Sequence, residues 1–332
     1  MLATTRLSLA LCAALGVGVT AVLATYAGLG TIYTALNDLG WPGLVGICVL
    51  QLLSMALCAA AWKSVADEAS FLFCLTARFI RAGVSNLAGV IPTVGEVAGA
   101  RSLSLLGISA GVAAASTVVD AGIEALAQAI YTIIGLIPLV FLVRPDEMTR
   151  WFAAMAVATG PIFAAFVITR RRGALRLAER IIERIAGVLG FPATNFDLSR
   201  NVLDIYQRRR HVWLALLLHL AGWFMSAVQL WVAAWLLNRP LSPGDALALQ
   251  SLAYAARGAF FFVPWGLGVQ EGTFVLVGAV LGVDAASALA FSLILRARDI
   301  LLGLPAILVW YGFEGRQRWL LIRVPTRKPY SE

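Results

Sequence analysis

Residues 81–124 decide how this chain folds, and they read RAGVSNLAGVIPTVGEVAGARSLSLLGISAGVAAASTVVDAGIE. The stretch is largely apolar and Pro92 interrupts it, yet it carries five ionisable side chains: Arg81, Glu96, Arg101, Asp120 and Glu124. A charge at the centre of a bilayer costs about 3 kcal/mol or more, so such residues usually face a bundle interior or a water-filled cavity. A broken backbone is tolerated there only where protein or water covers its polar groups. The stretch therefore predicts a broken or re-entrant membrane element that lines a polar cavity.

The same pattern recurs about half a chain later, in residues 257–299. Three residues keep one offset of 175 positions: Glu96, Gly107 and Glu124 correspond to Glu271, Gly282 and Asp299. Each glutamate lies within a GxxxG, and the expected backbone breaks are Pro92 and Gly95 in the first copy and Pro264 and Gly268 in the second. Paired interrupted segments in the two halves of a chain are typical of transporter binding sites. The alternative is a chance match in a chain rich in alanine, glycine and leucine, but the spacings hold without gaps.

The composition places the chain among membrane proteins. Of its 332 residues, 60% are hydrophobic and 13% are charged, whereas ordinary soluble domains carry about a quarter charged residues. We expect an all-α, polytopic membrane helix bundle of six to eight spans, whose two broken elements form an inverted repeat. The net charge of +8 is attributed to cations beside the apolar runs, where the positive-inside rule places them, and not to nucleic acid. The four cysteines form no CxxC, so we expect no disulfide or metal framework.

The chain is interpreted as a single membrane domain, residues 1–332, with two halves. The first half is residues 1–170, with its broken element at 81–107, and the second half is residues 211–314, with its broken element at 257–283. Between them, residues 171–210 form a basic amphipathic connector on the cytoplasmic leaflet, and residues 315–332 form a basic cytoplasmic tail. The apolar runs between Ala246 and Leu295 are each too short for a straight span of about 20 residues. They fit either closely spaced, charge-bearing spans or a second re-entrant hairpin that enters from the opposite side of the membrane.

Several polar residues fall within predicted spans. Asp120, Glu124 and Gln128 are four residues apart and share one helix face, which fits either a cavity lining or a hydrogen-bonded network between helices. His219 is isolated in an apolar run, where a hydrogen bond to a neighbouring helix is more common than proton relay. Residues 107–111 match G-x-S-x-G, but this motif requires a preceding strand and acid and histidine partners. The sequence also lacks an H-E-x-x-H, a P-loop and a Rossmann motif, so we expect no enzyme, no cofactor and no metal.

Residues 81–96 read R-x-G-x-x-N-x(5)-P-x-x-G-E. Together with LGIS, VPWGLGVQEG and the RARD stretch, they resemble the membrane domain of lysylphosphatidylglycerol synthase, the lipid-flippase part of the multiple peptide resistance factor family. The runs FFVPWGLGVQEG and LILRARDILLGLP are most similar to the stand-alone members associated with hopanoid biosynthesis, the HpnL-like proteins.

The resemblance implies a cavity for a lipid headgroup, lined by polar residues of both broken elements. Asp120 and Glu124, from the polar face described above, are added to these residues. The candidates are then Arg81, Asn86, Glu96, Arg101, Asp120, Glu124, Arg257, Glu271, Arg296 and Asp299. The synthases of the family carry an aminoacyl-transferase domain after the membrane part. This chain ends at Glu332 after a short basic tail, so we do not expect that activity.

These observations support the hypothesis of a lipid transporter or flippase in the bacterial inner membrane, with both termini in the cytoplasm. Glu96 and Glu271 are expected to meet in one hydrated cavity near the membrane midplane. The expected partners are membrane lipids, and the sequence indicates neither nucleic acid nor an oligomeric state. The alternative is a non-catalytic partner that holds enzymes of lipid biosynthesis at the membrane through the basic surface from Arg170 to Arg210.

Overall fold

The computed structural model describes residues 29–87, 93–239 apart from 141–197, and 241–323, and within these ranges the regular structure is helical. The expected break at Pro92, the first part of the connector and the end of the basic tail lie outside the described residues. In chain order the helices are α2 (Leu29–Val65), α3 (Phe71–Leu87), α4 (Val94–Leu105), α5 (Ala110–Val140), α8 (Leu198–Gln207), α9 (Arg209–Leu236), α10 (Pro243–Ala259), the 3-10 turn η1 (Pro264–Gly266), α11 (Val269–Val280) and α12 (Ala285–Arg323).

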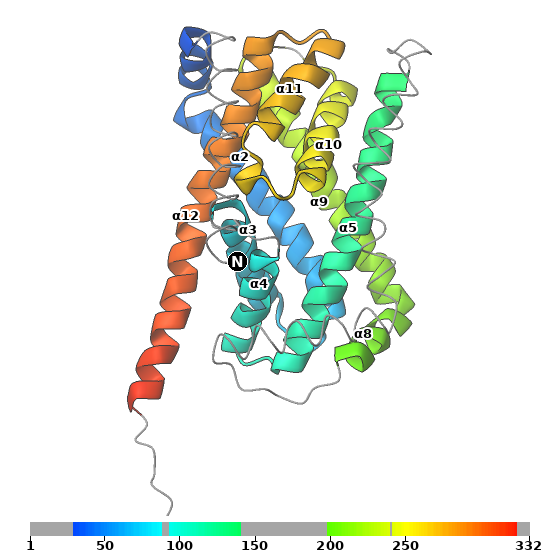
Figure 1. The fold of residues 1–332 in the computed structure, drawn as a ribbon, viewed down its shortest axis with the longest axis vertical. Helices are drawn as coiled ribbons and strands as arrows, with labels where there is room; N and C mark the ends of the chain where they lie inside the picture. The colour runs from blue at the N-terminus through cyan, green and yellow to red at the C-terminus, as the bar shows by residue number, and fades with distance from the viewer. Residues whose placement is uncertain (1–28, 88–92, 141–197, 240, 324–332) are drawn as a thin grey trace, which may run out of the picture.

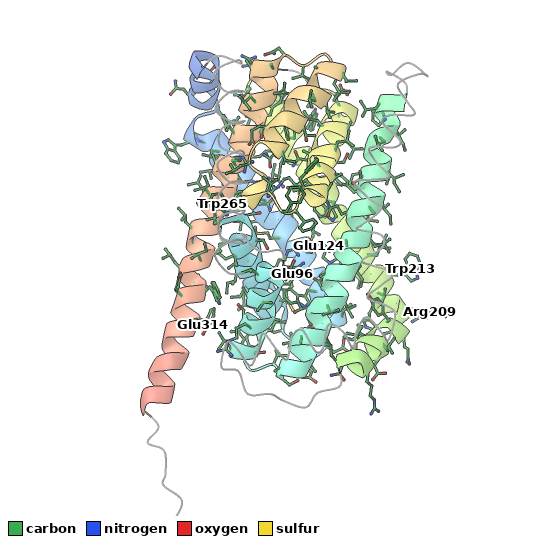
Figure 2. All side chains as sticks on the ribbon, in the orientation of Figure 1. Glu96, Glu124, Arg209, Trp213, Trp265 and Glu314 are labelled. Carbon is green, nitrogen blue, oxygen red and sulfur yellow. The ribbon has the colours of Figure 1, made fainter. Side chains whose placement is uncertain are left out.

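Three segments in the described part of the chain are long and apolar enough to cross a bilayer: Asn37–Val65, Ala110–Leu139 and Arg209–Leu236. The outer face of α9 shows why a membrane suits them. Trp213, Leu217 and Trp235 are 63%, 61% and 71% exposed, and Figure 2 shows Trp213 pointing away from the bundle. Lipid tails are as apolar as these side chains, so such a surface is stable in a bilayer without a protein partner. The prediction of an all-α membrane bundle is confirmed.

Two helical hairpins are too short to cross the membrane. The hairpin of α3 and α4 has helices of 17 and 12 residues, and the hairpin of α10 and α11 also has helices of 17 and 12 residues. A span needs about 20 residues, so a 12-residue helix turns back inside the bundle. Figure 1 shows α3 and α4 in its lower half and α10 and α11 in its upper half. The short apolar runs after Ala246 therefore form a re-entrant hairpin, α10 with α11, and not closely spaced spans. The two hairpins enter from opposite ends of the bundle.

The two 12-residue helices begin and end with the same backbone geometry. Thr93, which precedes α4, has a φ of 77°, and Gly268, which precedes α11, has a φ of 76°. Gly107 and Gly282 follow the ends of these helices with φ values of 99° and 76°. Positive φ is uncommon and costs about 1–2 kcal/mol for a residue with a side chain. Because both pairs are separated by 175 residues, they argue strongly against a chance match.

The hydrogen bonds that end these two helices also correspond. The amide of Ile108 donates to the carbonyl of Leu103 at 3.1 Å, and the amide of Val283 donates to the carbonyl of Gly278 at 2.8 Å. Each bond runs from the residue after the positive-φ glycine to a carbonyl five residues earlier, as in a Schellman motif. The repeat expected from side-chain spacing is thus present in the backbone as well.

The GxxxG sequences have different roles in the two copies. A Cβ atom at Gly95 would lie 1.9 Å from Ser85 Oγ, and one at Gly99 would come within 3.0 Å of a neighbouring side chain. Glycine at these positions lets α4 lie directly against α3 and, at Gly99, against Trp62 of α2 as well. In the second copy a Cβ atom at Gly272 would meet no neighbouring atom within 4 Å, whereas Gly268 provides the left-handed turn before α11.

Two long helices, α2 of the first half and α9 of the second, pack along each other. Gly222 of α9 allows a close approach, because a Cβ atom there would lie 2.9 Å from Cys58 Sγ. Ser54 Oγ donates to the carbonyl of Gly222 at 2.9 Å and joins the helices at the same level. This contact places α2 of the first half and α9 of the second half on one wall of the bundle, and the hairpins lie beside it.

Candidate functional site

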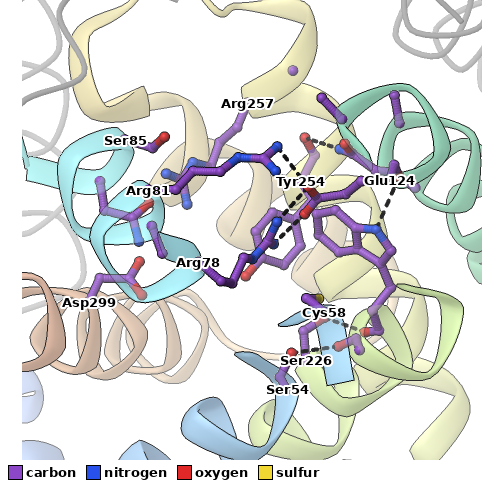
Figure 3. A pocket seen from close by; sticks show the side chains of 18 of the residues that line it. Ser54, Cys58, Arg78, Arg81, Ser85, Glu124, Ser226, Tyr254, Arg257 and Asp299 are labelled. Carbon is purple, nitrogen blue, oxygen red and sulfur yellow. Dashed lines mark hydrogen bonds and ion pairs between the residues drawn. The ribbon is translucent and has the colours of Figure 1, made fainter. Parts of the chain in front are cut away.

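A cavity of about 490 Å³ lies between the two halves of the bundle, and Figure 3 shows the side chains that line it. Its walls come from α2, α3, α4, α5, α9, α10 and α12. Seven of the lining side chains are arginines or carboxylic acids: Arg78, Arg81, Glu96, Glu124, Arg257, Arg298 and Asp299. Charged groups inside a helix bundle mark functional positions more often than structural ones.

Glu124 of α5 is the acceptor for both arginines of α3. Arg78 binds its carboxylate with two guanidinium nitrogens, and one of these contacts joins Arg78 Nη1 to Glu124 Oε2 at 2.7 Å. Arg81 Nη2 donates to the same Oε2 at 2.9 Å. Arg78 lies one helical turn before Arg81, so both point from the same face of α3. The pairing fixes the first hairpin against α5, and sequence reasoning missed Arg78 although this spacing indicated it.

Asp120 lies one turn before Glu124 but behind the cavity wall. It is fully buried, accepts from Arg81 Nη1 at 2.8 Å and lies 2.9 Å from His219 Nε2. Asp120 therefore supports Arg81 from behind and does not line the cavity. Of the three polar residues predicted to share one face of α5, Asp120 is buried behind the wall, and Glu124 and Gln128 line the cavity.

Glu96 is the most exposed of the three carboxylates that line the cavity, ahead of Glu124 and Asp299. Its side chain is 31% exposed, and its ion pair is with Arg81 Nη2 at 3.3 Å. It lies in the first turn of α4, where the helix dipole favours a negative charge. Glu96 faces the cavity as predicted, and Asn86 near the end of α3 lines it as well.

The other polar wall belongs to the second half. Arg257, at the end of α10, donates to Gln270 Oε1 at 3.2 Å and lies over the ring of Tyr254 at 5.9 Å. Within the described residues it has no carboxylate at ion-pair distance. Gly266 (φ 59°) allows the loop to pass close by, because a Cβ atom there would lie 3.0 Å from Arg257 Cγ. Arg257 is thus a cavity-lining cation with neutral partners.

Arg298 and Asp299 complete the lining from α12. Arg298 Nη2 donates to Asp299 Oδ1 at 2.7 Å, and Arg298 also binds the amide oxygen of Gln229 on α9. Asp299 was predicted as a site residue. Arg298 was not, although the RARD stretch, residues 296–299, places it next to Asp299 within the otherwise apolar residues 285–313 of α12.

The second glutamate of the repeat does not lie in the cavity, which corrects the expectation that Glu96 and Glu271 meet there. Glu271 is fully buried and accepts from Gly268 N at 2.8 Å and from Arg296 Nη2 at 2.9 Å. It therefore caps the start of its own helix and neutralises an arginine. Arg296 also donates to the carbonyls of Trp265 and Gly266 at 3.1 and 2.9 Å, so it supports the tip of the second hairpin and does not line the cavity either.

Arg101 was also expected in the cavity and lies elsewhere. Its Nε donates to Glu314 at 3.0 Å, which ties α4 to the distal part of α12. The sequence placed Arg101 in the broken element correctly, but Arg101 lies five residues beyond Glu96, more than one helical turn further along α4. Its partner Glu314 is labelled on the lower part of α12 in Figure 2.

The tips of the two hairpins touch at mid-height in the bundle. Trp265 of η1 donates from Nε1 to the carbonyl of Leu87, the last residue of α3, at 3.0 Å. Trp265 holds a φ of 57°, which is rare for a tryptophan. Its label in Figure 2 lies where the upper and lower hairpins approach each other. The cavity is thus adjacent to a contact between the two copies of the repeat.

These features define a helical membrane protein with two opposed re-entrant hairpins and a charged cavity between its halves. The family model for the lysylphosphatidylglycerol synthase TM region matches residues 13–306, so the chain belongs to that family. No curated protein and no solved structure matches the chain. Membership confirms the family resemblance and indicates a membrane function related to lipids, whereas the narrower similarity to hopanoid-associated members stays a prediction.

Proposed function

We propose that this protein moves phospholipids between the two leaflets of the bacterial inner membrane by admitting the headgroup into the cavity. The observation that carries the proposal is a charged cavity enclosed by helices from both halves, beside the contact between two re-entrant hairpins. Opposed re-entrant elements around a central site are the arrangement on which alternating access is built in many transporters. The acyl chains would remain in the bilayer while the headgroup crosses.

The charges of the cavity favour a headgroup that contains phosphate. Arg257 offers a guanidinium whose partners are an amide oxygen and an aromatic ring, so a phosphate there would gain a charge-assisted bond without displacing a carboxylate. Glu96, partly exposed, would accept from a hydroxyl or ammonium group on the same headgroup. An uncharged hopanoid headgroup would use Glu96 but leave Arg257 without an anion.

The distribution of cations supports an orientation with the lower end of Figure 1 in the cytoplasm. Arg208, Arg209 and Arg210 lie where α8 meets α9, at the end where α2 also ends. The opposite end carries Arg239 paired with Asp284. The positive-inside rule assigns the arginine-rich end to the cytoplasm.

The proposal is tested by reconstituting the full chain in liposomes and measuring how fast tail-labelled phosphatidylglycerol and phosphatidylethanolamine cross. We expect Glu96→Gln and Arg257→Gln each to slow crossing about tenfold or more, because a hydrogen bond to a charged group contributes about 1.5–3 kcal/mol. Glu314→Gln is the matched control, since it breaks an ion pair away from the cavity and should leave the rate within about twofold.

Wild-type rates in both cavity variants would contradict the proposal. Crossing of a labelled hopanoid without either phospholipid would contradict the role given to Arg257. In this proposal the protein is a transporter and not an enzyme. The competing role, a partner that holds lipid-biosynthesis enzymes at the membrane, predicts instead that neither cavity variant has an effect in cells.

A further inference from the structure

Three side chains that can ligate a metal ion meet on the wall of the cavity. They are Cys58 of α2, Glu124 of α5 and His219 of α9, and one donor atom from each lies within 4.8 Å of the others. Cys58 and Glu124 also line the cavity, so the cluster is open on that side. None of the contacts described so far requires a cysteine and a histidine to share this place.

The imidazole of His219 is oriented like a metal ligand. Its Nε2 lies 2.9 Å from Asp120 Oδ1, while its Nδ1 is buried without a hydrogen-bond partner in the described part of the chain. His219 itself is fully buried. A carboxylate that holds one ring nitrogen and leaves the other to the metal is the usual second-sphere arrangement of histidine ligands. A buried nitrogen without a partner is costly, and a metal ion would satisfy it.

We propose that Cys58, Glu124 and His219 bind a divalent transition-metal ion of the Zn²⁺ type. Thiolate, imidazole and carboxylate are the three ligand classes that Zn²⁺ takes in proteins, at about 2.0–2.3 Å. Tetrahedral binding at these lengths brings donors to about 3.5 Å from one another, so side-chain rotations would close the cluster. Three protein ligands leave the fourth position for water or another ligand, and this position opens into the cavity.

The charges around the cluster fit a divalent cation. Glu96, Asp120 and Glu124 supply three negative charges, and Arg78 and Arg81 supply two positive ones. With Cys58 as a thiolate, the group carries two excess negative charges, which a divalent ion would cancel. The two arginines occupy three of about four lone-pair positions on the Glu124 carboxylate, so one remains for the metal.

A proton on His219 would balance the thiol form of the cluster instead, but it fits the geometry less well. Protonated imidazole donates from both nitrogens. The groups that face His219 are Asp120 and Glu124 of α5 and Cys58 of α2, with Arg78 and Arg81 of α3 bound to the two carboxylates. Asp120 accepts one proton through Nε2, but Nδ1–H would have only the sulfur of Cys58, a weak acceptor, among these described groups. A metal uses that lone pair directly.

The test uses the full chain in lipid nanodiscs, stripped with a chelator and titrated with Co²⁺ as a spectroscopic substitute for Zn²⁺. We expect one equivalent of Co²⁺ to bind, with a thiolate-to-cobalt charge-transfer band in the near ultraviolet that Zn²⁺ abolishes by displacement. Cys58→Ser should remove the band. Cys48→Ser is the matched control, because Cys48 is also on α2 and lies outside the cluster, and it should keep the band.

Absence of Co²⁺ and Zn²⁺ binding to the wild-type chain at micromolar concentration would overturn the proposal, and this result needs no variant. Binding without the charge-transfer band, or with the same band in Cys58→Ser, would overturn it as well, since the metal would then lie elsewhere. These measurements involve no lipid transfer. The metal site can therefore fail while the transport proposal stands, and the reverse also holds.

Discussion

The helices α4 and α11 have the same length and the same backbone at both ends, but their glutamates have different surroundings. Glu96 is partly exposed in the cavity and has one ion pair at 3.3 Å. Glu271 is fully buried between Arg296 and the start of its own helix. The position equivalent to Arg296 in the first copy, 175 residues earlier, is Ala121, which lines the cavity. Arg296 thus makes Glu271 a structural residue, whereas Glu96 has no such arginine at the equivalent position and can contact a ligand.

This difference shows how a repeat can be symmetric in fold and asymmetric in chemistry. The shared backbone needs only turn residues with positive φ and short helices, and both copies have them. The second copy uses its ionisable groups to hold the hairpin tip, because Arg296 binds the carbonyls of Trp265 and Gly266. The first copy directs Arg78 and Arg81 to α5 and leaves Glu96 available. The cavity is therefore chemically a property of the first hairpin, with Arg257 added from the second.

The largest loss of stability should come from neutralising the buried carboxylate of Glu271. Glu271→Gln leaves Arg296 without its carboxylate, and breaking a buried pair on one side costs about 3–5 kcal/mol of unfolding free energy. The same substitution at Glu96 should cost less than about 1 kcal/mol, because its side chain is partly exposed and its ion pair is long. Thermal unfolding of both variants in detergent measures the contrast, and equal losses of stability would remove the distinction between the glutamates.

The second prediction transfers the missing arginine to the first copy. Ala121→Arg should place a guanidinium beside Glu96, as Arg296 lies beside Glu271, and occupy the cavity. Lipid crossing should fall about tenfold, since an ion pair of roughly 1.4 kcal/mol would have to break before Glu96 meets a headgroup. Ala121→Gln is the control for bulk, and lipid crossing in liposomes is the measurement. If glutamine slows crossing as much as arginine does, volume and not charge explains the effect.

Much of the fold was accessible from the sequence because it follows from spacing along the chain. The 175-residue offset of Glu96 and Gly107 predicted two copies, and the short apolar runs before Leu295 allowed a re-entrant hairpin. The sequence also placed Glu96, Glu124 and Asp299 in a polar site, and the structure brings all three to one cavity. These inferences succeed because burying a charge in lipid is costly wherever it occurs.

The partners of each charge were less accessible, because they depend on contacts between distant helices. The equal offset of the glutamates gave no sign that Arg296 would claim Glu271 and remove it from the cavity. The candidate metal ligands Cys58, Glu124 and His219 come from three helices with no common spacing, so no sequence motif marks them. Asp120 was counted as lining because the helix period gives its face but not its depth.

The smallest expected effect tests the symmetry of the backbone itself. Gly107 and Gly282 have positive φ, and neither has an atom within 4 Å of the position a Cβ would take. Substitution by alanine therefore adds no clash, and the cost is conformational, about 1 kcal/mol at each site. Gly107→Ala and Gly282→Ala should lower the thermal unfolding midpoint by similar amounts. If the unfolding midpoint falls several times further in one variant than in the other, the two turns are not equivalent. The symmetry of the repeat would then be limited to the backbone conformation and would not extend to the energetic cost of each turn.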